Sequence, residues 1–120
     1  MVKSRRQCLR VAELRKEGFT DLRDWLSHKN NMHVLRNGRI FIHKDGEKEI
    51  FHYPRSPWHN PFTLKEYTLD ESLRLYREHI GRLVAENKLH LEELRGKTLG
   101  CYCETDKCHA GVLVELVNAS

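Results

Sequence analysis

The chain has 120 residues, a hydrophobic fraction of 39% and a charged fraction of 32%, values typical of a single folded domain over residues 1–120 and too apolar for a disordered chain. No apolar run approaches the ~20 residues that cross a bilayer, and no apolar signal core follows the basic N-terminus, so we expect an intracellular, cytoplasmic protein with no membrane partner. The formal net charge of +4 is concentrated in residues 1–40, which carry ten Lys or Arg and four Asp or Glu.

A basic helix is predicted within residues 1–19, because Ser4–Gln7 has the spacing of a capping box. The helix would run to about Glu17 and stop at Gly18, with Cys8 packed inward as a small hydrophobe. Its excess of arginine and lysine is typical either of a surface that attracts nucleic acid or a phosphorylated ligand, or of a solvated helix face.

A second short helix is predicted over Asp21–Ser27, with strands after it. The segments His33–Arg36 and Arg39–His43 have the composition of strands. The Asn37-Gly38 dipeptide between them is a strong hairpin signal, so the sequence predicts that these two strands pair with each other.

A second turn is predicted at Asp45-Gly46, leading into a strand over Glu49–Tyr53. Residues 54–63 carry three prolines, which remove backbone donors and favour a stiff, irregular loop. One register of the second hairpin places apolar groups on a single face by pairing Ile42 with Phe51 and Ile40 with Tyr53.

The longest helix is predicted to open at a capping box, Thr68–Glu71, and to fade near Asn87, with a short continuation through Leu94. Thr98–Cys103 has the pattern of a short buried strand, and a final helix would begin at Cys108. The apolar stripe of the long helix, which we assign to the core, comprises Leu69, Leu73, Tyr76, Ile80, Leu83 and Val84.

This order of elements predicts an α/β fold, a small mixed sheet covered by helices that ends in a strand–turn–helix unit. The connection before the last strand is long enough for a helical crossover, which favours parallel pairing there.

Three of the four cysteines and one histidine fall within nine residues of that last unit: Cys101, Cys103, Cys108 and His109. Without a secretory signal, reduced thiols or metal ligands are favoured over disulfides. In a strand, Cys101 and Cys103 share one face, while Cys108 lies in the first helical turn, where the helix dipole favours a thiolate. We therefore predict a functional site at the carboxyl end of this strand.

Four interpretations of this cluster stay open. Zinc accepts a Cys3His ligand set, although the spacing differs from the usual paired knuckles. An iron–sulfur cluster held by three cysteines would leave one iron open to substrate. Without a metal, Cys108 would be a nucleophile activated by its helix position. The fourth interpretation is a corner of small, buried packing residues.

Arg95–Cys103 followed by Cys108–Leu113 resembles the C-terminal motif of a family known as domain of unknown function 4326, which is common in phages, large DNA viruses and bacteria. His33–Arg36 is similar to that family's Y-I-G-R strand, and His59–Phe62 to its G-N-P-F loop. The resemblance covers roughly residues 20–118. The resemblance implies a functional site at the cysteine cluster but does not indicate a reaction. If the chain is viral, it also implies a location in the host-cell cytoplasm.

Other candidate ligand-binding groups lie on the extended segments of the resemblance. An arginine fork suits phosphate or carboxylate, and the Trp58 ring could either stack on a nucleobase or anchor the proline loop into the core. The sequence thus favours a small enzyme, or enzyme-like domain, that binds a nucleotide, nucleobase or nucleic-acid component. The alternative is a non-enzymatic module, stabilised by zinc, that binds nucleic acid or protein. The candidate substrate-binding residues are Arg36, Arg55, Ser56, Trp58 and Asn60.

Overall fold

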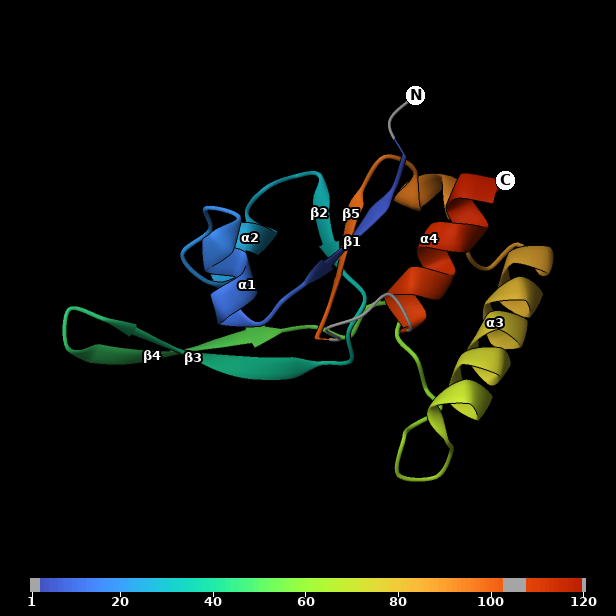
Figure 1. Cartoon of the computed structure of the whole chain (residues 1–120), viewed down its shortest axis with the longest axis horizontal. Coiled ribbons are helices and arrows are strands. Elements are labelled where there is room, and N and C mark those ends of the chain that lie inside the picture. The colour runs from blue at the N-terminus through green and yellow to red at the C-terminus, as the bar shows by residue number, and fades with distance from the viewer. Residues whose placement is uncertain (1–2, 103–107, 120) are drawn as a thin grey trace.

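The computed structural model describes residues 3–102 and 108–119 of the chain. In these two ranges, no helix is long and apolar enough to cross a membrane. Figure 1 shows the elements in order: β1 (Arg5–Cys8), α1 (Val11–Lys16), α2 (Leu22–Leu26), β2 (Asn31–His33), β3 (Gly38–Lys44), β4 (Glu47–Tyr53), α3 (Leu69–Ala85), the 3-10 helix η1 (Leu91–Leu94), β5 (Thr98–Cys101) and α4 (His109–Ala119).

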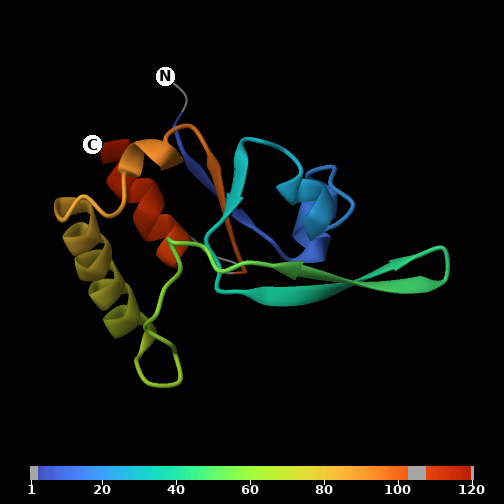
Figure 2. The ribbon, with the colours of Figure 1, turned by 180° about the vertical axis from the view of Figure 1, so that it is seen from behind.

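The centre of the fold is a three-stranded parallel sheet in the order β1-β5-β2. Strand β5 pairs with both neighbours, and its four residues are all buried. The helices α1 and α2 lie on one side of this sheet and α4 and α3 on the other, as the two opposite views show (Figures 1 and 2). The α/β class and the parallel pairing of the last strand are confirmed.

The sheet and the residues of the α1–α2 side approach each other closely at Gly100 in β5. A Cβ at this position would lie 2.6 Å from Leu9 Cδ2 and 2.7 Å from Trp25 Cη2. Because side chains alternate along a strand, Leu99 and Cys101 face the opposite layer, which contains α4. The glycine therefore allows the two layers to close around the strand that leads to the thiols.

The N-terminal segment corrects our prediction, because residues 5–8 form strand β1 and the first helix begins only at Val11. Ser4 caps no helix. Its hydroxyl instead donates to the Leu94 carbonyl at 2.5 Å and accepts the Gly96 amide at 3.1 Å. The strand is stabilised by β5, whose residues are about ninety positions away, and a local capping pattern carries no information about such pairing. The helix end at Gly18 is confirmed, with φ of 94°.

The predicted Asn37-Gly38 hairpin is wrong. Strand β2 ends at His33, and the Val34 amide makes one more bond to β5, donating to the Gly100 carbonyl at 3.0 Å. The residues that follow do not pair with β3. Strand β3 begins at Gly38 and belongs to a separate two-stranded antiparallel sheet with β4. Over the described residues the strands therefore form two sheets, in place of the single mixed sheet that the sequence suggested.

The β3–β4 hairpin does turn at Asp45-Gly46, where both residues have positive φ. Its register pairs Ile40 with Phe51 and Ile42 with Glu49, two residues away from the predicted pairing. A shift of two residues keeps every side chain on the expected face, because the strand period is two.

In the second half of the chain the signals for element ends are confirmed, whereas Leu69, which we assigned to the core, is 38% exposed. Residues 54–63 form no helix or strand, and Thr68 and Glu71 make the reciprocal capping box that opens α3. The short continuation is η1, and α4 follows Cys108 directly. The predicted strand is described as far as Cys101, while the expected position of Cys103 on the same face lies outside the described residues.

Candidate functional site

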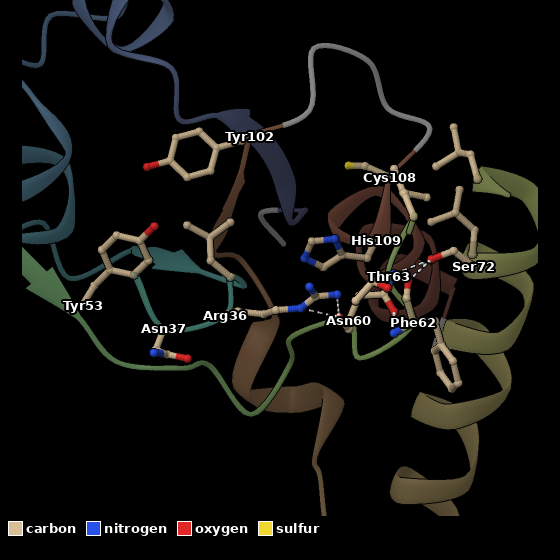
Figure 3. Close-up of a pocket in the computed structure, with 14 residues that line it drawn as sticks. Arg36, Asn37, Tyr53, Asn60, Phe62, Thr63, Ser72, Tyr102, Cys108 and His109 are labelled. Atoms are coloured by element: carbon tan, nitrogen blue, oxygen red, sulfur yellow. Dashed lines mark hydrogen bonds between the residues drawn. The ribbon is translucent and has the colours of Figure 1, made fainter. Parts of the chain in front are cut away.

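A pocket of about 370 Å³ lies beside the carboxyl end of β5 and the start of α4. Its walls come from the β2–β3 connection, the end of β4, the proline loop and the first turn of α3. Figure 3 shows Tyr53 and Tyr102 on one side and Cys108, Asn60 and Ser72 on the other, with His109 and Arg36 between them. Because the segments that meet here are far apart in sequence, the pocket exists only in the folded chain.

Two of the predicted cysteines come together at this point. The Sγ atoms of Cys101 and Cys108 are 3.3 Å apart, and the two residues are 0% and 1% exposed. Cys108 immediately precedes α4, and its carbonyl accepts the Val112 amide at 3.1 Å, so its thiol lies at the helix N-terminus. The guanidinium of Arg6 donates to Cys101 Sγ at 3.7 Å. A helix N-terminus and an arginine both favour the thiolate form of a cysteine.

His109 lies in the first turn of α4, and its Nε2 is 2.7 Å from the Val34 carbonyl oxygen. Since a carbonyl oxygen only accepts, Nε2 carries the proton of the neutral ring and Nδ1 is left as the acceptor. Burial lowers the pKa of His109, and the contact with Val34 and negative charge at Cys101 act in the opposite direction. The ring also packs edge-on against Tyr76, with the centroids 5.4 Å apart. Its orientation is therefore set by the core.

The predicted metal ligands are brought together only in part. Over the described ranges 3–102 and 108–119, no group of three or more His, Cys, Asp or Glu side chains is placed to hold a metal ion. Cys101 and Cys108 supply two thiols, whereas His109 directs Nε2 to a backbone carbonyl. The third predicted sulfur ligand, Cys103, lies outside these ranges. A set of three sulfurs would therefore have to include Cys103.

Two of the predicted substrate-binding residues, Arg36 and Asn60, meet at the pocket. The Nε and Nη2 atoms of Arg36 donate to the Asn60 carbonyl at 3.0 and 2.6 Å. The Asn60 side chain donates to Ser72 Oγ at 2.9 Å and accepts the Phe62 amide at 2.9 Å. Asn60 thus fixes the proline loop to α3, and Arg36 keeps an exposed guanidinium at the pocket wall.

The other three predicted substrate-binding residues do not line this pocket. Trp58 is 1% exposed in the core, so its ring presents no face to a nucleobase. Ser56 is also buried, and its backbone amide donates to the Leu35 carbonyl while its hydroxyl accepts the Trp58 amide. Arg55 is exposed outside the pocket lining. Ser56 and Trp58 fix the loop in place.

The aromatic surface of the pocket comes instead from residues that the sequence did not single out. Tyr102 is 37% exposed, and burial together with a hydrogen bond to Tyr53 raises the pKa of its hydroxyl. Tyr53 also packs edge-on against His33, at 5.3 Å between centroids. The one sequence signal for Tyr102 was its place between two cysteines, and Tyr53 had none beyond its position at a strand end.

A parallel sheet with a thiol pair at its carboxyl edge defines a small α/β protein with a candidate site in the common position for that class. The sequence model of the family described as Domain of unknown function (DUF4326) matches residues 19–119, and the chain belongs to this family. This confirms the family resemblance that the sequence motifs suggested.

Two relatives share part of the chain. An uncharacterized protein of Acanthamoeba polyphaga mimivirus is 29% identical over 97 residues, which cover 73% of each chain. An uncharacterized 12.4 kDa protein from the nrdA-td intergenic region of Enterobacteria phage T4 is 33% identical over 52 residues, 41% of this chain and 48% of its own. No solved structure matches this protein.

Proposed function

We propose that this protein is a small enzyme, or enzyme-like domain, that binds a nucleotide, a nucleobase or a nucleic-acid component in the pocket beside β5. The observation that carries the proposal is the meeting of a buried thiol pair, a histidine and an arginine at one concave site at the carboxyl end of a parallel strand. Open α/β sheets bind ligands at this edge.

The ligand class follows from the chemistry of the pocket walls. A volume of about 370 Å³ lies within the range of small-molecule sites. Tyr53 and Tyr102 offer aromatic surface to a planar base, a role the sequence had suggested for Trp58. The guanidinium of Arg36 would exchange its contact with the Asn60 carbonyl for a phosphate or carboxylate, which makes stronger, charge-assisted hydrogen bonds.

The chemistry would come from Cys108. Its position at the start of α4 favours a thiolate, and the neighbouring Cys101 Sγ, 3.3 Å away, is the atom to which the Arg6 guanidinium donates. The thiolate would add to an electrophilic carbon of the bound ligand, and the electron pair of that carbon's double bond would move to the atom at its other end. His109, neutral and with Nδ1 as an acceptor, would take a proton at the same end of the pocket. The described residues supply this version of the site without any additional ligand.

A metal version of the same site is the second candidate, and the 3.3 Å thiol pair favours it equally. Cys101, Cys103 and Cys108 would then hold zinc or an iron–sulfur cluster. Zinc there could act in catalysis or only fix the corner of a binding module without enzymatic activity.

The test begins with untagged protein purified without oxygen and assayed for zinc, iron and acid-labile sulfide. One metal per chain that is lost in Cys103→Ser and Cys108→Ser selects the metal version. If the protein is metal-free, if Cys108 can be alkylated, and if a bound ligand protects it from alkylation, the nucleophile version is selected.

Ligand binding is measured by thermal shift with nucleobases, nucleosides and nucleoside phosphates. Arg36→Ala should weaken binding of a phosphorylated ligand about tenfold or more, the usual size of a charge-assisted hydrogen bond. Arg55→Ala removes the same charge outside the pocket and should leave binding unchanged. A panel without any binder, or equal losses in both arginine variants, would contradict the proposal.

A further inference from the structure

The β3–β4 hairpin has one face that is entirely exposed. Its register places a cationic or histidine side chain opposite another at both ends, with an apolar pair in the middle. Three cross-strand pairs make up this surface, which we call the outer hairpin face: Arg39 with His52, Phe41 with Ile50, and His43 with Lys48.

The opposite face of the hairpin is turned toward the body of the protein. Ile42 is buried there, and Glu49 forms an ion pair of 2.6 Å with Arg23 of α2. Because strand side chains alternate, the outer hairpin face is the opposite face from Ile42 and Glu49. Phe41 and His43 also border the cavity between β3 and the α1–α2 layer. Figures 1 and 2 show the hairpin as an arm that extends beyond the rest of the chain.

The composition of the outer hairpin face differs from that of an ordinary solvated strand surface. Its six residues include no carboxylate, and Phe41 and Ile50 are 47% and 50% exposed. Lys48 Nζ lies 4.1 Å from the centroid of the Phe41 ring, and Arg39 Cζ lies 5.8 Å from it. Two permanent cations therefore surround an exposed aromatic ring.

From this surface we infer a second binding site: the outer hairpin face binds single-stranded nucleic acid. The charge of the face complements a polyanion, and unpaired bases stack on exposed aromatic rings while phosphates meet Lys and Arg. A phosphate would draw the Lys48 ammonium away from its place over the Phe41 ring and leave that ring face to a base. The bases of a duplex are stacked inside it, and the centre of this face lacks the Asn, Gln or Arg side chains that read base edges in a groove. The face therefore fits a single strand better than a duplex.

This inference does not rest on the proposed chemistry of the pocket. Cys108 and Arg36 lie outside the outer hairpin face, so their variants leave strand binding intact, and hairpin variants leave nucleotide binding intact. The failure of one proposal is thus distinguishable from the failure of the other.

The test is fluorescence anisotropy with a labelled 15-nucleotide single-stranded DNA, titrated over several salt concentrations. Removing both cations, in Arg39→Ala/Lys48→Ala, should reduce the slope of log K against log salt by roughly 1.4, about 0.7 for each lost phosphate contact. Phe41→Leu keeps the apolar bulk but removes the stacking ring, and should weaken binding about tenfold. Lys44→Ala is the matched control, because Lys44 carries the same charge on the opposite face of β3.

Three results would overturn the inference. The first is that the single strand does not bind. The second is that Lys44→Ala lowers the salt slope by half as much as Arg39→Ala/Lys48→Ala, the same loss per charge, or that Phe41→Leu binds like the wild type. Either outcome would indicate only a diffuse attraction of charges. The third is preferential binding of duplex DNA or of anionic phospholipid vesicles in the same assay. Circular dichroism of each variant confirms that the exposed substitutions leave the fold intact.

Discussion

Replacing Gly100 with alanine tests the packing that brings the thiol strand into place. The added Cβ would lie 2.6 and 2.8 Å from the two terminal methyls of Leu9 and 2.7 Å from the Trp25 ring. Carbon atoms in contact are normally about 3.5–4.0 Å apart, so these side chains would have to move by roughly 1 Å. Both are buried in the core, which leaves them little room to do so.

The expected cost follows from two opposing effects. Overpacking a filled core destabilises a protein by about 1–3 kcal/mol. Replacing glycine also restricts the unfolded chain, which returns about 0.4–1 kcal/mol. We therefore expect Gly100→Ala to lower the free energy of unfolding by about 1–2 kcal/mol.

Gly81→Ala is the matched control. Gly81 is an exposed residue within α3, and a Cβ there meets nothing within 4 Å. Alanine in a helix interior is favoured over glycine by about 0.5–1 kcal/mol, so this variant should be more stable than the wild type. The same substitution is thus expected to have opposite signs at the two sites.

Urea unfolding, followed by tryptophan fluorescence and circular dichroism, measures both variants. With a typical slope of about 1–3 kcal/mol per molar urea, the two midpoints should differ by on the order of 1 M. If Gly100→Ala proves as stable as the wild type, the Leu9 and Trp25 side chains do not confine this position and our account of the layer packing is refuted.

Three further predictions concern individual contacts. Tyr76→Phe leaves the buried Trp58 carbonyl without its 2.5 Å hydrogen bond and should cost about 1–3 kcal/mol in urea unfolding; an unchanged midpoint would contradict this. Thr68→Ala removes the capping box of α3 and should cost about 1 kcal/mol, while Thr68→Ser should retain most of that stability. Burial lowers the pKa of His109 below its ordinary 6.5, so the unfolded chain binds the proton first and stability falls as the pH drops below that value. His109→Gln should therefore show a shallower loss of stability between pH 7 and 5, and an unchanged slope would refute this assignment.

Much of the local structure could be predicted from neighbouring residues. The Thr68–Glu71 capping box, the stop at Gly18 and the Asp45-Gly46 turn all appear where their sequence signals lie. Such signals work because the hydrogen bonds concerned join residues only a few positions apart. The Asn37-Gly38 signal failed because Val34 and Leu35 were drawn into the core, which separates β2 from β3.

The candidate site was predicted in part. Cys108, His109, Arg36 and Asn60 do line one pocket, and Cys101 joins Cys108 behind it. Of the two interpretations of Trp58, anchoring in the core is the one that the structure bears out. The contribution of two tyrosines was not evident, because an aromatic residue has the same local sequence whether it faces the core or a cavity.

The sequence by itself determined where the long helix begins, where the first helix ends, that the last strand is buried, and that cysteines gather at the carboxyl end of that strand. Only the tertiary structure decided that residues 5–8 form a strand, because their partners in β5 lie 93 positions away and no local hydrogen bond marks the pairing. It also decided which side chains share the pocket. That choice depends on the relative placement of the proline loop, α3 and α4, which is set by the packing of the whole core.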